Sequence, residues 1–156
     1  MLFDPKHEES LDALEAQLHR APAITPNLIS NVIAGACTRL PVMKRAGKAA
    51  RIDQLIEAGA LIDAALALVD FELPAWRLRR LVYEDGEWHC SLSRYPNLPL
   101  ALDDSANASH EVLPLAILSA LVEADRRMGA TRGIRTQTVP QVRPTSGYAI
   151  CCDNFS

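Results

Sequence analysis

The sequence predicts an α+β protein that is predominantly helical, with about four helices packed against one antiparallel β-hairpin at residues 76–94. Three observations predict this class. Alanine and leucine dominate the apolar residues, and aromatic residues make up only 5% of the chain, which favours helix packing over a sandwich or barrel. Apolar residues recur at helical spacing in several segments. The pair Asp85-Gly86 separates two stretches with strand character.

The first two helices are predicted from leucine spacing and from capping residues. A helix over residues 9–20 is expected because leucines recur at spacings of three and four, at Leu11, Leu14 and Leu18. Thr25 followed by Pro26 is a favourable N-cap and first-turn pair for a second helix. This helix is expected to run to about Leu40 and to end at Pro41.

Two strongly apolar helices are expected to form the centre of the fold. One is predicted to run continuously from about residue 48 to 70, and its part 58–69 is apolar almost all round. Gly59 either kinks this helix or lets a neighbouring helix approach closely. The last long helix is predicted from Ser109 or later to about Met128.

The hairpin prediction includes a register and a β-bulge. A two-residue type I′ turn at Asp85-Gly86 pairs Tyr83 with Trp88 and Leu81 with Cys90. In an uninterrupted strand, Trp76 and Leu78 would then lie on the opposite face. A bulge at Arg79-Arg80 would return them to the core side, because one extra residue reverses the alternation.

The sequence predicts one domain over residues 1–128, followed by an extended C-terminal tail over 129–156. Residues 96–107, rich in Pro, Asn and Asp, are predicted to form a loop. The tail lacks helical periodicity, and a short strand near residues 134–139 is left open.

Composition and charge favour a soluble cytoplasmic protein. The net charge is −3, which makes a nucleic-acid partner unlikely, and no apolar run is long enough to span a membrane. The N-terminus lacks the pattern of a secretory signal. Four cysteines without a C-x-x-C pair indicate reduced thiols, although the adjacent Cys151 and Cys152 leave a redox pair open as an alternative.

The sequence contains no catalytic signature, and we expect no cofactor and no metal site. It has neither a G-x-G-x-x-G motif nor a P-loop, and its four histidines show no ligand spacing. Whether the protein is an enzyme stays open, although the absence of a catalytic signature favours a protein that is not an enzyme. If a ligand pocket exists, it is expected between the hairpin and the last helix, lined by Trp76, Arg79, Tyr83, Trp88 and His89.

The preferred hypothesis is a non-enzymatic interaction module that forms a homo-oligomer or binds a protein partner. Helix faces left over after the core is formed would provide the interface, with Leu61, Leu68, Leu115, Leu118 and Val122 as candidate contact residues. The alternatives are an enzyme or small-ligand binder that uses the hairpin pocket, and a winged-helix-like nucleic-acid binder.

One stretch of the hairpin carries a resemblance to other proteins. Residues 78–94, LRRLVYEDGEWHCSLSR, resemble short uncharacterised bacterial proteins of no known function. The resemblance extends over about the hairpin and the last helix. It implies a bacterial, cytoplasmic origin, and it implies no activity and no site residue.

Overall fold

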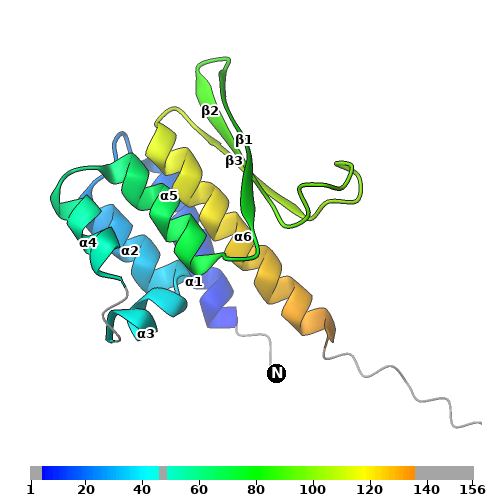
Figure 1. Ribbon diagram of the computed structural model, residues 1–156, viewed down its shortest axis with the longest axis horizontal. Coiled ribbons are helices and arrows are strands. Elements are labelled where there is room, and N and C mark those ends of the chain that lie inside the picture. The colour runs from blue at the N-terminus through cyan, green and yellow to red at the C-terminus, as the bar shows by residue number, and fades with distance from the viewer. Residues whose placement is uncertain (1–4, 46–48, 136–156) are drawn as a thin grey trace, which may run out of the picture.

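Six helices and three strands make up residues 5–45 and 49–135, the part of the chain that the computed structural model describes (Figure 1). The predicted class, α+β and mostly helical, is confirmed. In chain order the elements are α1 (Pro5–Arg20), α2 (Pro26–Ala36), α3 (Arg39–Arg45), α4 (Ala50–Glu57), α5 (Leu61–Glu72), β1 (Arg77–Glu84), β2 (Glu87–Ser93), β3 (Ser105–His110) and α6 (Leu113–Arg135).

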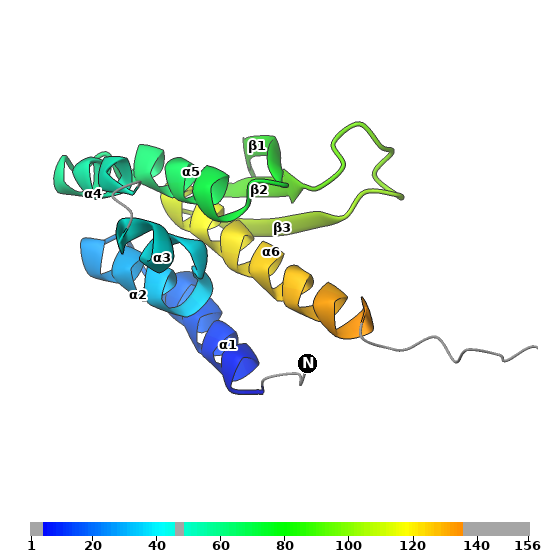
Figure 2. The same ribbon diagram turned by 60° about the horizontal axis from the view of Figure 1, so that its bottom comes forward.

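Helix α6 lies at the centre of the fold, between the sheet and α5 on one side and α1 and α2 on the other (Figure 2). Its segment from Leu115 to Leu118 has no exposed surface, because apolar residues cover its whole circumference. The expected packing of two apolar helices against each other is confirmed, since α5 contacts α6. Four of the five candidate interface residues are completely buried in this core, namely Leu68, Leu115, Leu118 and Val122, and Leu61 is half-buried against it. A second chain could not reach the four buried side chains in this fold.

The predicted second helix is divided in two. It ends at Ala36, and after a short break α3 begins at Arg39, so that Pro41 lies in the first turn of α3 instead of ending a helix. Glu72 lies at the end of α5, and its carboxylate is buried. It accepts hydrogen bonds from the backbone N–H groups of Thr38, Arg39 and Leu40, with N–O distances of 3.2, 3.1 and 2.5 Å. These groups would otherwise be unsatisfied at the start of α3, so a distant side chain caps the helix.

The predicted continuous helix over 48–70 is also two helices, α4 and α5, and the break falls at Gly59. Gly59 has φ of 72°, and its N–H donates to Ile56 O at 3.1 Å while the Ala60 N–H donates to Leu55 O at 2.9 Å. This is the Schellman arrangement of a helix end, in which a glycine adopts the left-handed conformation without steric cost. The glycine therefore ends the helix outright.

The hairpin has the predicted register. The sheet is antiparallel with strand order β1-β2-β3, and Tyr83 pairs with Trp88 and Leu81 with Cys90 across a turn with positive φ at Asp85 and Gly86. The predicted bulge is present, because the register shifts between Leu78 and Arg80. Trp76 is completely buried as expected. Leu78 pairs with the buried Leu92 and so lies on the core-side face as predicted, although 44% of it stays exposed on the edge strand β1.

The third strand, β3, was not predicted. Residues 105–110 have the sequence SANASH, which carries little β-propensity and was expected to be loop and helix cap. The segment becomes a strand because one edge of β2 is not paired with β1. It pairs antiparallel with that edge, from Trp88 opposite His110 to Ser93 opposite Ser105. Its small inward residues, Ala106 and Ala108, let α6 pack closely against the sheet.

Both terminal helices are longer than predicted. Helix α1 begins at Pro5 instead of about residue 9, and α6 continues to Arg135 instead of ending at Met128. The rest of the predicted tail, residues 136–156 with Cys151 and Cys152, lies outside the described residues.

Candidate functional site

The sheet separates the five residues that the sequence placed in one pocket. Trp76 is fully buried in the core, and Tyr83 pairs with Trp88 on the core-side face, with ring centroids 5.2 Å apart. Arg79 and His89 instead border an open concavity on the opposite face. Because these side chains lie on two faces of one sheet, they do not converge on a common ligand.

The space between the hairpin and α6, where the pocket was expected, is filled by side chains. Cys90, Leu92 and Ala106 have at most 1% of their surface exposed and belong to one apolar cluster with α6. A ligand could enter there only by opening the core. The outer face of the same sheet, in contrast, is accessible.

That outer face carries an open concavity of about 590 Å³, which we call the sheet-face concavity. Its floor comes from two neighbouring cross-strand rows, in which Ser91 pairs with Asn107 and His89 pairs with Ser109. On β1, Arg80 pairs with Ser91 and borders the concavity from the edge. The strand alternation aims these polar side chains away from the core.

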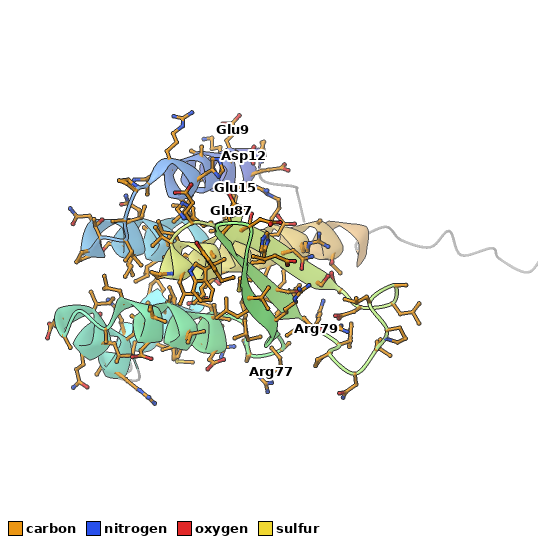
Figure 3. The ribbon with its side chains drawn as sticks, turned by 90° about the horizontal axis from the view of Figure 1, so that it is seen from above. Glu9, Asp12, Glu15, Arg77, Arg79 and Glu87 are labelled. Carbon is orange, nitrogen blue, oxygen red and sulfur yellow. The ribbon has the colours of Figure 1, made fainter. Side chains whose placement is uncertain are left out.

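The loop joining β2 to β3 folds back at one end of this concavity, where Asp103 holds it. The Asp103 carboxylate accepts hydrogen bonds from Ser93 Oγ at 2.6 Å, from the Tyr95 backbone N–H at 3.0 Å and from the Arg79 guanidinium. The bulge at Arg79 brings its side chain to the base of the loop (Figure 3). Arg79 also donates to the Leu98 carbonyl at 3.4 Å. The loop is therefore fixed to the strands by charged hydrogen bonds, which are the stronger kind.

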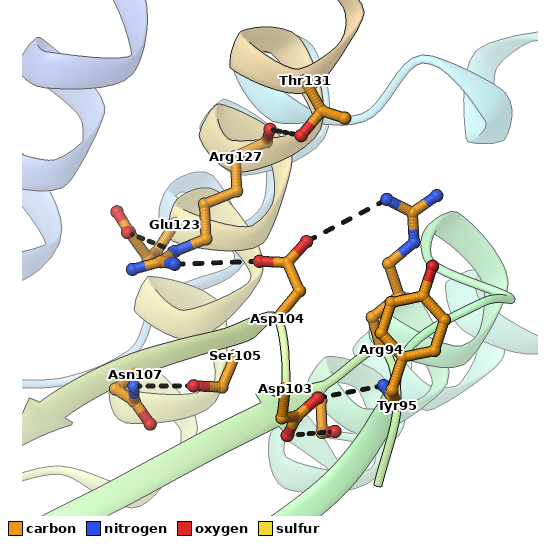
Figure 4. A network of polar contacts seen from close by, with 10 residues as sticks. Arg94, Tyr95, Asp103, Asp104, Ser105, Asn107, Glu123, Arg127 and Thr131 are labelled. Carbon is orange, nitrogen blue, oxygen red and sulfur yellow. Dashed lines mark hydrogen bonds and ion pairs between the residues drawn. The ribbon is translucent and has the colours of Figure 1, made fainter. Parts of the chain in front are cut away.

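A chain of ion pairs connects the same loop base to α6 (Figure 4). Asp104 lies 4.0 Å from Arg94 and 3.8 Å from Arg127, and Arg127 Nε donates to Glu123 at 2.9 Å. The Arg94 backbone N–H also donates to the Asp104 carbonyl, at 3.0 Å. These contacts connect the base of the loop to the central helix α6.

The tip of the loop is apolar and exposed. We call residues 95–102 the apolar loop. Its large side chains are exposed to 50%, 41%, 72% and 69%, for Tyr95, Leu98, Leu100 and Leu102 respectively. Leu100 also forms part of the wall of the sheet-face concavity. This exposed apolar loop was not predicted. The signal for it was the presence of three leucines in a segment rich in Pro and Asn, because leucines without strand or helix periodicity are not expected to be buried in the core.

The Asp103 interactions have an electrostatic consequence. The hydrogen bond from Ser93, with those from the Tyr95 N–H and Arg79, lowers the pKa of the Asp103 carboxyl below its ordinary value, against the opposing effect of burial. A lowered pKa in the folded state means that the stabilisation is present above the unfolded carboxyl's pKa of about 3.9. It is lost as the pH falls through the folded pKa, so the loop is held at neutral pH and released in acid.

Substituting Asp103→Asn is expected to increase amide hydrogen exchange in residues 95–104 by about tenfold, because a charged acceptor of three hydrogen bonds is lost. Exchange rates are compared at pH 7 after correction for intrinsic rates, with the exposed Asp63→Asn as the matched control. Equal protection of the loop in both variants would show that Asp103 does not hold it.

Other chemistry is not supported by the described residues. Burial raises the pKa of the Cys90 thiol to about 11 and that of Cys37 further, so both stay protonated and unreactive. Within residues 5–45 and 49–135, no three His, Cys, Asp or Glu side chains are grouped so that they could hold a metal ion. None of the helices in that part of the chain is long and apolar enough to cross a bilayer.

Comparison with known proteins supplies no family. No protein-family model matches the sequence, and neither a curated protein nor a solved structure is similar to it. Function is therefore argued from the geometry of the outer sheet face and its loop.

Proposed function

We propose that this protein is a non-enzymatic interaction module that binds another protein chain through the apolar loop, residues 95–102. The observation that carries the proposal is the exposure of Leu100 and Leu102, at 72% and 69%, on a loop whose base is fixed. Contiguous exposed apolar side chains cost solubility, and they commonly mark contact sites. Burying two such leucines in a partner would contribute most of the affinity of a small interface.

The fixed base supports this proposal for an energetic reason. A loop that is ordered before binding loses little conformational entropy when the partner associates. Asp103 and the Asp104 ion pairs supply that order at the base of the loop. Within the loop, Leu98 N–H donates to Tyr95 O and Leu102 N–H to Pro99 O, both at 2.9 Å, and Arg79 donates to Leu98 O. Binding residues on a loop presented by a rigid scaffold are a common arrangement.

The partner is a second copy of the chain or a different protein, and we place the interaction in the cytoplasm. Cys37 and Cys90 are buried and unbonded, which supports a reducing compartment. A standard interface has about 20–30 residues a side, and the apolar loop has only the residues 95–102. The partner is therefore expected to receive the loop in a pocket and to contact the neighbouring sheet edge as well.

Site-specific photo-crosslinking tests this function. A photoreactive side chain at position 98 is expected to give one discrete adduct in the producing cell, and twice the mass of the chain would identify a second copy. The double substitution Leu100→Ser and Leu102→Ser is expected to reduce the adduct at least about tenfold, because two buried leucines are lost. Its fold should be unaffected, since both side chains are exposed.

The control places the same photoreactive side chain at Glu57, which is exposed on α4. Identical adducts from positions 98 and 57 would count against the proposal. So would a position-98 adduct that persists unchanged in the double serine variant.

A further inference from the structure

The floor of the sheet-face concavity combines hydrogen-bonding groups that the protein itself does not use. Among the described residues, the side chains of His89, Ser91 and Ser109 have no hydrogen-bond partner, and Asn107 has only a long contact of 3.4 Å from its Nδ2 to Ser105 Oγ. Hydroxyl, amide and imidazole groups can all donate hydrogen bonds. These four side chains are therefore available to a ligand.

Strand geometry sets the spacing of these donors. Directly paired residues are about 5 Å apart, and residues two apart on a strand are about 7 Å apart. Ser91 and Asn107 form one pair, and His89 and Ser109 form the next pair on the same face. A single compact group seated between the two pairs would be within reach of side chains from both strands.

Arg80 is the positive charge at the concavity that an anion can reach. Arg80 lies at the edge beside Ser91, and its guanidinium is 3.6 Å from the Glu84 carboxylate, both side chains being more than 60% exposed. Such an exposed ion pair is weak, so another anion can readily replace Glu84 as the partner of Arg80. Arg79 lines the loop end of the concavity. Its charge is already paired with Asp103, so it does not add a second unpaired positive charge.

We infer that the sheet-face concavity binds the phosphate group of a small phosphorylated molecule. A phosphate carries about −1.5 to −2 charges at pH 7 and three terminal oxygens that accept hydrogen bonds. It can therefore engage Arg80 together with donors from both rows, whereas the two oxygens of a carboxylate would leave several donors unpaired. Binding of the phosphate replaces Glu84 as the partner of Arg80. This site shares Leu100 with the proposed protein contact, but its hydrogen-bonding and charged groups come from the strands, and phosphate binding does not depend on that contact.

Backbone amide shifts of the intact chain test this inference, with inorganic phosphate as the probe at constant ionic strength and pH 7. Phosphate is expected to cause saturable shift changes centred on residues 89–91 and 107–109. Arg80→Ala is expected to raise the dissociation constant about tenfold, because a charged hydrogen bond is lost. Glu84→Gln is expected to lower it about threefold by removing the competing carboxylate.

The matched control is Arg77→Ala, which removes the same charge from an exposed position of β1 outside the concavity and should change the constant less than about twofold. The spectrum of each variant also reports whether it is folded. Shift changes that never saturate, or equal constants for Arg77→Ala and Arg80→Ala, would overturn the site. Acetate binding as tightly as phosphate would overturn the assignment to phosphate.

Discussion

Replacing Trp76 with alanine is expected to lower the free energy of unfolding by about 3–5 kcal/mol, as is usual when a fully buried tryptophan is truncated. Trp76 is the largest completely buried side chain, and it lies in the short connection where the chain passes from α5 into β1. Its loss would leave a cavity in the apolar core. Denaturant unfolding monitored by circular dichroism measures the change.

The matched variant Trp76→Phe separates packing from hydrogen bonding. The indole Nε1 of Trp76 is buried and has no hydrogen-bond partner among the described residues. Phenylalanine removes this unsatisfied donor and refills most of the space, so its cost is expected to be less than half that of alanine. A phenylalanine variant as unstable as the alanine variant would contradict this account of the site.

Replacing Glu72 with alanine is expected to lower the free energy of unfolding by about 2–4 kcal/mol. The substitution leaves the backbone N–H groups of Thr38, Arg39 and Leu40 without their acceptor at a partly buried helix start. Amide exchange is expected to increase first in α3, because this carboxylate connects α3 to α5.

Two further variants make the Glu72 prediction specific. Glu72→Gln keeps one acceptor oxygen and should lose an intermediate amount of stability. Glu57→Ala removes a carboxylate from an exposed position of α4 and should change stability by less than about 0.5 kcal/mol. Equal losses in Glu72→Ala and Glu57→Ala would show that the carboxylate does not cap α3.

The hairpin could be predicted in detail because its determinants are local. Asp85 and Gly86 tolerate positive φ, which selects a two-residue turn and with it the pairing of Tyr83 with Trp88. The position of Trp76 relative to that pairing required a bulge, and the register shift is there. Each inference depended on residues within about ten positions of one another.

The breaks between α2 and α3 and between α4 and α5 were harder to predict from the sequence, because one of their causes lies far away along the chain. The break at Gly59 has a local signal, the glycine itself, but whether a glycine kinks a helix or ends it depends on what the following residues pack against. The start of α3 depends on Glu72, more than 30 positions later, whose carboxylate reaches it only after α5 has packed. No pattern around Pro41 could reveal that partner.

The candidate site could be predicted only in part. Arg79 and His89 do border the outer concavity, but Trp76, Tyr83 and Trp88 lie on the other face, because alternation along a strand sends neighbouring side chains in opposite directions. Asp103 was not singled out, since its importance comes from Ser93 and Arg79, which the fold brings to it.

The sequence by itself determined the α+β class, the packing of the two apolar helices against each other, and the register of the hairpin, because apolar periodicity and turn chemistry act over a few residues. The tertiary structure alone decided that residues 105–110 form a strand, that Glu72 caps α3 and that Asp103 fixes the apolar loop. In each of these cases a polar group or a strand edge is satisfied by a partner from elsewhere in the chain, and such partners are chosen by packing.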